Sequence, residues 1–264
     1  MGRKAITFKQ IYNSQLHDFL YGIKHLNGSK NKSLHEIRVA IKHLKIYSLF
    51  TDRFLKTSGP SKKLRQQLKP IFKSAGKIRT ALLNLKLTKP VAACKPYIDH
   101  LNKSLDKFEH KLNHEKKEFD KPFFVKDADK VIRILKKIRS QAALDECELL
   151  IKEKENSIRK ELRQKISTEK LHGIRKDLKI IKAMKKIRTD LGGGKSAGEK
   201  INTLTKLEET IGKWHDKVVL LEDLKKYASK HQAGKALKSF IDKLQKETHR
   251  SQSSSVFLLK KTFQ

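Results

Sequence analysis

The stretch L-H-E-I-R-V-A-I-K-H-L-K at residues 34–45 returns 137 positions later as L-H-G-I-R-K-D-L-K-I-I-K at residues 171–182. At about 100° per residue in an α-helix, the apolar side chains of each copy fall on one stripe. The matched basic side chains fall within roughly 80° of arc, and this arc lies about 100° round from the apolar stripe. Each copy is therefore predicted to be an amphipathic helix whose cations border its buried face, and such a border favours a groove for a polyanion.

The basic residues that recur in register form two sets, one in each copy. We call them the first basic stripe (His35, Arg38, Lys42 and Lys45) and the second basic stripe (His172, Arg175, Lys179 and Lys182). A charged run is usually a solvated helix face, but these four residues are kept while neighbours change, Glu36 to Gly173 and Val39 to Lys176. Arginine forks clamp phosphate oxygens, lysines act as mobile charges, and a histidine beside an anion donates more strongly once protonated. Arg79 and Lys186 are predicted to extend this surface.

The whole chain is cationic. Its 264 residues include 62 Lys and Arg against 28 Asp and Glu, for a formal net charge of +34. Residues 1–125 contribute +18 (27 − 9) and residues 126–264 contribute +16 (35 − 19), so a basic tail is excluded as the source. Self-repulsion destabilises a compact cation, and a polyanionic partner would relieve it.

The composition predicts an all-α protein. Helix-forming residues dominate, the five prolines and twelve glycines are few, and no strand-like alternation persists. A second internal match, G-K-I-R-T at residues 76–80 and G-K-W-H-D at residues 212–216, has an offset of 136. The two matches in the same order predict an internal duplication into two four-helix halves, residues 1–125 and 126–264, each long enough to bury a core.

The helices are expected at residues 6–26, 33–54, 61 to beyond 85, 90–119, 127–166, 168–191, from 196 onward, and 231–248. Pro70 is expected to kink or interrupt the third, and the fifth is expected to be broken once. Ser33 and Ser196 each begin a capping-box pattern, and Asp127 or Asp129 is expected to cap the fifth helix. Residues 251–255 are expected to form a loosely ordered tail, after which V-F-L-L at 256–259 could dock.

Neither a membrane span nor a signal peptide is evident, and the two cysteines, Cys94 and Cys147, are expected to be reduced thiols. These features predict a soluble cytoplasmic protein.

Neither a metal nor a cofactor is expected. G-G-G-K-S at residues 192–196 lacks the first glycine of a P-loop and follows a helix, while His110 and His114 lack a third ligand. Phosphoryl transfer would need carboxylates grouped for Mg²⁺, but the acids are scattered among lysines. We therefore expect that the protein is not an enzyme.

The doubled L-H-x-I-R-x-x-x-K-x-x-K motif, each copy followed by a G-K-x-x-[RD]-like element, resembles the CHAD family (conserved histidine α-helical domain) over roughly residues 6–250. This resemblance implies two pseudo-symmetric four-helix bundles around a basic central channel, binding of inorganic polyphosphate, and association with polyphosphate granules. Both basic stripes would line the channel, Arg79 would match the family's arginine after the first motif, and Asp216 the acidic residue after the second.

The chain departs from the family pattern at Lys42 and Lys45, where arginines are common, at Thr80, where an acid is expected, and at Ala183, where a tyrosine is common. Lysine keeps the charge without the fork. Two alternatives stay open: a helical protein that binds nucleic acid through the same charge, and a metal-dependent polyphosphate or triphosphate enzyme. The sequence does not indicate the oligomeric state.

Overall fold

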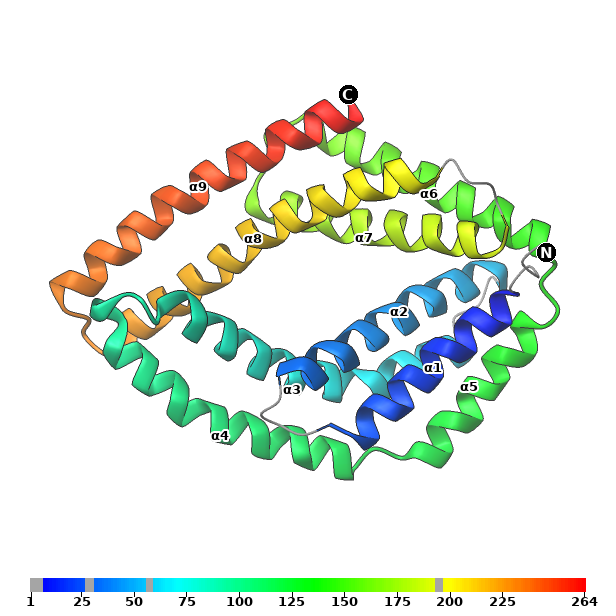
Figure 1. Cartoon of the computed structure of the whole chain (residues 1–264), viewed down its shortest axis with the longest axis horizontal. Coiled ribbons are helices and arrows are strands. Elements are labelled where there is room, and N and C mark those ends of the chain that lie inside the picture. The colour runs from blue at the N-terminus through cyan, green and yellow to red at the C-terminus, as the bar shows by residue number, and fades with distance from the viewer. Residues whose placement is uncertain (1–6, 27–30, 56–58, 193–196) are drawn as a thin grey trace. The chain divides into compact units, whose positions relative to one another are not determined.

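The computed structural model describes residues 7–26, 31–55, 59–192 and 197–264. Within these ranges it contains nine α-helices, one short 3-10 helix and no strand, which confirms the all-α class (Figure 1). The elements are α1 (Phe8–Lys24), α2 (Asn31–Leu55), α3 (Gly59–Thr88), η1 (Ala92–Cys94), α4 (Lys95–Lys117), α5 (Lys121–Leu135), α6 (Ser140–Leu162), α7 (Thr168–Asp190), α8 (Ala197–Lys230) and α9 (Lys235–Phe263).

The chain divides into two compact units. The first comprises Met1–Leu87 with Ile98–Ala143, and the second comprises Thr88–Tyr97 with Leu144–Gln264. The predicted boundary between residues 125 and 126 falls inside α5, which packs against α1 of the first unit. The second unit includes η1, which packs against α9, and the Tyr97 hydroxyl donates to the Asp223 carboxylate of α8 over 2.7 Å.

The apolar stripes of the repeated motif are buried, as predicted. Each of the four side chains of the first apolar stripe is at most 1% exposed, and each of the four side chains of the second is at most 2% exposed. These residues are Leu34, Ile37, Ile41 and Leu44 in α2, and Leu171, Ile174, Leu178 and Ile181 in α7. Each such burial contributes about 1.5–3 kcal/mol to folding, so these stripes fix which face of each helix meets its core.

The buried positions of α3 and α8 also match, at the offset of 136 found in the second internal match. The buried pairs are Leu68 and Leu204, Ile71 and Leu207, Ala75 and Ile211, and Ile78 and Trp214. Trp214 is 1% exposed and belongs to the core, as predicted. The internal duplication stays a prediction, and this repeated burial pattern supports it.

Two predicted helix starts are wrong. Ser33 lies inside α2, which begins at Asn31, so it is not the N-cap. Asp120 caps α5 by accepting a hydrogen bond from the Phe123 amide, whereas the predicted cap Asp127 lies one to two turns further on and is fully buried. There it accepts hydrogen bonds from Lys130 (2.8 Å) and from Gln67 of α3 (3.2 Å). The predicted cap Ser196 lies outside the described residues.

The predicted helix at residues 127–166 is two helices, α5 and α6, and Pro70 is accommodated within the single helix α3.

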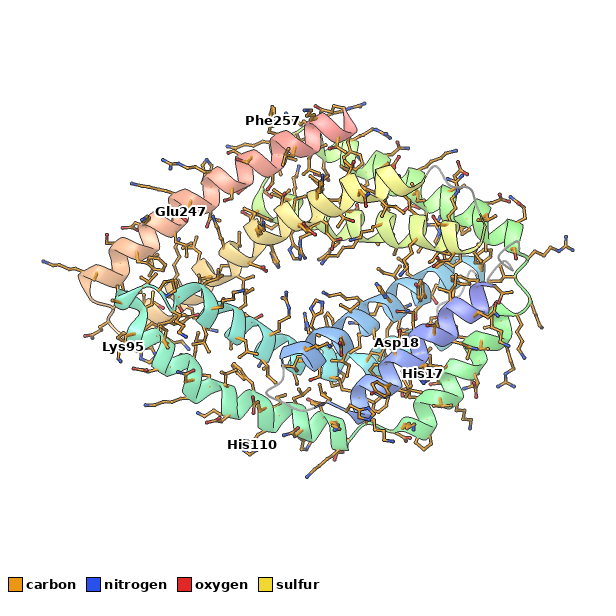
Figure 2. The ribbon with its side chains drawn as sticks, viewed as in Figure 1. His17, Asp18, Lys95, His110, Glu247 and Phe257 are labelled. Carbon is orange, nitrogen blue, oxygen red and sulfur yellow. The ribbon has the colours of Figure 1, made fainter. Side chains whose placement is uncertain are left out.

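The prediction of a loose tail after residue 250 is wrong, because α9 continues to Phe263. Ser255 and Leu259 are fully buried and extend the core face of α9, whereas Phe257, labelled in Figure 2, is 69% exposed. The serine run therefore lies within this helix, with Ser255 on its packed side, and does not end it.

Cys94 and Cys147 are both free and buried. Burial raises the pKa of Cys94 to about 11 and, with a contribution from Glu146, that of Cys147 to about 12, so both thiols are protonated at neutral pH. In the part of the chain that the structure describes, every helix is too short or too polar to cross a membrane.

Candidate polyanion-binding site

The first basic stripe lies along α2 at the edge of its buried face. His35 is exposed, and Arg38, Lys42 and Lys45 are half-buried. Arg38, Lys42 and Lys45 therefore lie at the border of the core, as predicted, whereas His35 lies further out. Cations in such a position are partly removed from water, which raises the free-energy cost of their charge and increases the strength of any anion contact.

Phe72 of α3 holds two members of this stripe. The Arg38 Nη1 atom donates a hydrogen bond of 2.7 Å to the Phe72 carbonyl oxygen. The Arg38 guanidinium carbon lies 4.3 Å from the centroid of the Phe72 ring, and the Lys45 ammonium lies 3.9 Å from the same centroid. Contacts of this kind hold cations in place without neutralising them, so the positive charge of both side chains remains available to a ligand.

Gly76 gives Arg38 the space for this arrangement. A Cβ atom at Gly76 would lie only 2.6 Å from Arg38 Nη1, so any larger residue there would move the guanidinium. In the second unit, a Cβ at Gly212 would lie 3.6 Å from Arg175 Nη2, which is an ordinary contact. In each unit, the arginine of the L-H-x-I-R motif thus faces the glycine that begins the G-K element. The distance from the added Cβ to the guanidinium is shorter in the first unit.

Like charges surround the first basic stripe. Burial, followed by the nearby charge of Arg79, lowers the pKa of Arg38 to about 10. Burial lowers the pKa of His35 as well, with Arg79 and Lys42 adding to the shift, and burial with the charges of Arg38 and Lys69 lowers that of Lys45. Arg79, which was predicted to extend the basic surface and to match the family's arginine, therefore lies near the stripe. The structure adds Lys69, which sequence reasoning missed.

An open pocket of about 450 Å³ lies at the N-terminal end of this stripe. Its lining comprises Lys32 and His35 from α2 with Arg79, Leu82, Leu83 and Lys86 from α3. Lys32 and Lys86 were not predicted as site residues, although both are basic like the predicted ones. Their only sequence signal is helical spacing from His35 and Arg79.

The second basic stripe lies on α7 in the second unit. His172, Arg175, Lys179 and Lys182 are all half-buried, so the prediction holds for this helix too. Burial lowers the pKa of His172, and the charges of Lys176, Arg175 and Lys179 lower it further. Its ring centroid lies 4.7 Å from that of His215 on α8, the residue at the position that matches Arg79.

The second basic stripe forms an ion pair with an acidic residue. The Lys182 ammonium is 3.0 Å from a carboxylate oxygen of Glu208 on α8, and the next lysine on α7, Lys185, is 3.5 Å from Glu155 on α6. Lys186, predicted to extend the surface, is exposed. Part of the positive charge of α7 is therefore compensated within the fold. The two basic stripes have equal formal charge, so this compensation could not be inferred from the stripes themselves.

Phe72, Lys69 and Glu208 could not be found from the motif alone. Phe72 lies three residues after Lys69 and four before Gly76, so the three share one face of α3. Nothing in the sequence states that this face meets α2.

The described residues contain no group of three or more His, Cys, Asp or Glu side chains placed to hold a metal ion. His110, labelled in Figure 2, and His114 are both exposed on α4.

Comparison with known proteins agrees with this architecture. The family model of the CHAD domain matches residues 10–219. The crystal structure of the CHAD domain from the plant Ricinus communis superposes with a TM-score of 0.74 at 15% sequence identity, covering 96% of this chain and 91% of that one. At this identity the likeness concerns the fold. A search of the curated proteins found no match. Since the family model spans well over half of the chain and includes both basic helices, this protein belongs to the CHAD-domain family.

Proposed function

We propose that this protein binds inorganic polyphosphate, without catalysis, through its two basic stripes. The observation that carries the proposal is the crowding of Arg38, Arg79 and Lys45 around α2 and α3, where burial and mutual repulsion lower the pKa of Arg38 to about 10. Such crowding destabilises the unliganded fold. A chain of phosphates would supply the missing negative charge at several of these positions together.

The chemistry of the stripe favours a phosphate chain over a nucleic acid. Proteins that bind single strands usually stack bases on aromatic side chains. Arg38 and Lys45 already cover the Phe72 ring, which lies beside the first stripe. Family membership supports the same ligand class, as the sequence resemblance implied. The central channel implied by that resemblance stays a prediction.

A competition titration tests the proposed ligand. Labelled long-chain polyphosphate is bound at physiological salt and displaced with unlabelled polyphosphate, RNA or duplex DNA. We expect polyphosphate to compete at least a hundredfold better per phosphate than either nucleic acid. Equal competition would instead support the alternative that the charge serves nucleic-acid binding, because counterion release alone does not discriminate between polyanions.

The contribution of the arginine forks is tested by replacing Arg38 and Arg175 together with glutamine. Glutamine retains a donor for the Phe72 carbonyl at position 38 but loses the charge and the bidentate fork. We expect most of the polyphosphate affinity to be lost while the thermal unfolding transition stays cooperative. Unchanged affinity in the folded double variant would overturn the assignment of the stripes.

The non-catalytic part of the proposal is tested separately. Polyphosphate is incubated with the protein and Mg²⁺ or Mn²⁺, and chain length and free phosphate are followed. We expect both to stay constant, and metal-dependent shortening or extension would establish the enzymatic alternative.

We also propose that the protein is cytoplasmic and associates with polyphosphate granules. A fluorescently tagged chain is expected to colocalise with stained granules and to become diffuse when both arginines are replaced.

A further inference from the structure

The pocket beside the first basic stripe contains more cationic side chains than the repeated motif supplies. Lys32, His35, Arg79 and Lys86 converge on it from two helices, and Leu82 and Leu83 provide the apolar part of its lining. Its volume of about 450 Å³ lies within the range of about 300–1,000 Å³ typical of small-molecule sites. Two of its four polar residues, Lys32 and Lys86, lie outside the matched motifs.

The corresponding positions of the second unit carry a different charge. The offsets of 137 and 136 relate Lys32 to Glu169, Arg79 to His215 and Lys86 to Glu222. The burial of α2 and α7 repeats at the first offset, and that of α3 and α8 at the second, so these are the same helical positions. His35 faces Arg79 in the first unit, and His172 lies against His215 in the second. Three cations around one histidine are thus replaced by two carboxylates and a second imidazole.

We propose that the pocket formed by Lys32, His35, Arg79 and Lys86 is a phosphate subsite of the first unit that the second unit lacks, so that a short condensed phosphate binds once per chain. This inference rests on the proposed function and adds where, within the chain, the ligand is held most tightly. Its ligand class is a phosphoryl group of a condensed phosphate, tripolyphosphate being the smallest convenient probe.

The charges elsewhere on the two stripes strengthen this asymmetry. In the second unit, Glu208 already pairs with Lys182, so a phosphate there must displace a carboxylate. In the first unit, Arg38 and Lys45 contact the Phe72 ring and lie near the like charges of Arg79 and Lys69. A phosphate bound in the first unit relieves repulsion, whereas one bound in the second competes with an existing ion pair.

The test compares two charge-matched double variants of the full chain. The first, K32E/K86E, gives the pocket the acidic residues found at the matched positions of the second unit. The control, K107E/K111E, makes the same change of net charge at two exposed lysines of α4 in the same unit. All four lysines are exposed, so both variants should fold, which circular dichroism and thermal unfolding will check. Calorimetric titrations then measure binding of tripolyphosphate and of long-chain polyphosphate at physiological salt.

We expect wild type and K107E/K111E to bind one tripolyphosphate per chain with similar affinity, and K32E/K86E to bind it at least about tenfold more weakly, because two phosphate-facing cations have become anions. Two equal tripolyphosphate sites in the wild type, or the same change of tripolyphosphate affinity in both variants, would overturn the subsite. The proposed function would still stand in that case if the wild type bound long-chain polyphosphate. A wild-type chain that bound neither phosphate would instead refute the proposed function itself.

Discussion

Arg38 shows how a single residue joins the two sequence motifs. Its guanidinium donates to the Phe72 carbonyl, lies on the Phe72 ring and fits against Gly76, while Arg79 repels it. The carbonyl and the ring hold the side chain, and Arg79 adds a like charge beside it. A cation held in this way is pre-organised for an anion, so little conformational entropy is lost when the ligand binds.

The close approach at Gly76 leads to a prediction with a matched control. Replacing Gly76 with Ala places a Cβ 2.6 Å from the present position of Arg38 Nη1, so the guanidinium must move and polyphosphate affinity should fall several-fold. Alanine favours a helix over glycine by about 1 kcal/mol, so thermal stability should not fall much. Fluorescence polarisation with labelled polyphosphate and a thermal melt measure both effects.

The control is Gly212→Ala, where the new Cβ lies 3.6 Å from Arg175 Nη2. It should gain the same helix propensity and keep its affinity within about twofold, since an ordinary contact requires no movement. Equal affinity of the two alanine variants would show that the position of Arg38 is not needed for binding.

The two motif histidines predict a pH dependence. Burial and neighbouring cations lower the pKa of His35 and His172, so the unfolded chain binds more protons than the folded one as the pH falls below about 6.5. The free energy of unfolding of the ligand-free protein should therefore decrease as the pH decreases through that window. A bound polyanion favours the protonated rings, so affinity should rise as the pH falls through the same window.

Replacing both histidines with glutamine separates this effect from the titration of the ligand itself. The double variant should show a flatter increase of affinity between about pH 7.5 and pH 5.5 than the wild type, measured by calorimetry in matched buffers. Superimposable pH profiles would show that the imidazoles do not take up protons on binding.

At the scale of elements, α9 shows how a polar run can belong to a core helix. Ser251–Ser255 reads as a tail because serine favours turns, yet Ser255 lies on the buried face and its hydroxyl donates to the Ser251 carbonyl over 2.8 Å. Leu259 and Phe263 continue that face at helical spacing. A small polar side chain whose hydroxyl bonds its own helix can therefore belong to a buried face, which the apolar residues that follow extend.

Two adjacent leucines test this packing. Leu259 is fully buried and Leu258 is 38% exposed. Leu259→Ala should lower the free energy of unfolding by about 2–5 kcal/mol, because it removes buried methyl groups and leaves a cavity. Leu258→Ala should cost less than about 1 kcal/mol. Urea denaturation measures both, and equal small losses would mean that the end of α9 does not pack.

At the scale of the whole molecule, a formal charge of +34 remains after every acidic residue is counted, and the described ion pairs are distributed unevenly. Those of α7 with Glu208 and Glu155 compensate one basic helix of the second unit, while the stripe of α2 in the first unit is crowded by further cations. Each unit thus carries a repeated stripe of equal formal charge in a different electrostatic environment. We infer that ligand binding contributes unequally to the stability of the two units.

This charge predicts a ligand-dependent stability. Long-chain polyphosphate at low salt should raise the melting temperature, because it binds the organised stripes of the folded state and relieves their repulsion. The shift should shrink steeply with added salt and nearly vanish by about 1 M. Scanning calorimetry measures it, with orthophosphate at the same phosphate concentration as the control. An equal shift with orthophosphate would contradict binding of a chain.

The sequence by itself determined the all-α class, the buried stripes of α2 and α7 and the basic residues that flank them. Helical periodicity is a local property, so a dozen residues suffice to predict which side chains share a face. The resemblance to the CHAD family also placed Arg79 in the site, at the position of the family's arginine after the first motif. Helix ends were less predictable, as Asp120 and Asp127 show, because several nearby residues have capping chemistry and packing selects among them.

Only the tertiary structure decided which of these charges are compensated. Phe72 and Gly76 lie more than thirty residues from Arg38, and Glu208 lies 26 residues from Lys182, so their contacts depend on how α3 and α8 pack. The same packing gathers Lys32 and Lys86 into one pocket. Two motifs with the same four basic residues therefore differ in their electrostatics, because the free energy of a buried charge depends on neighbours that the motif does not contain.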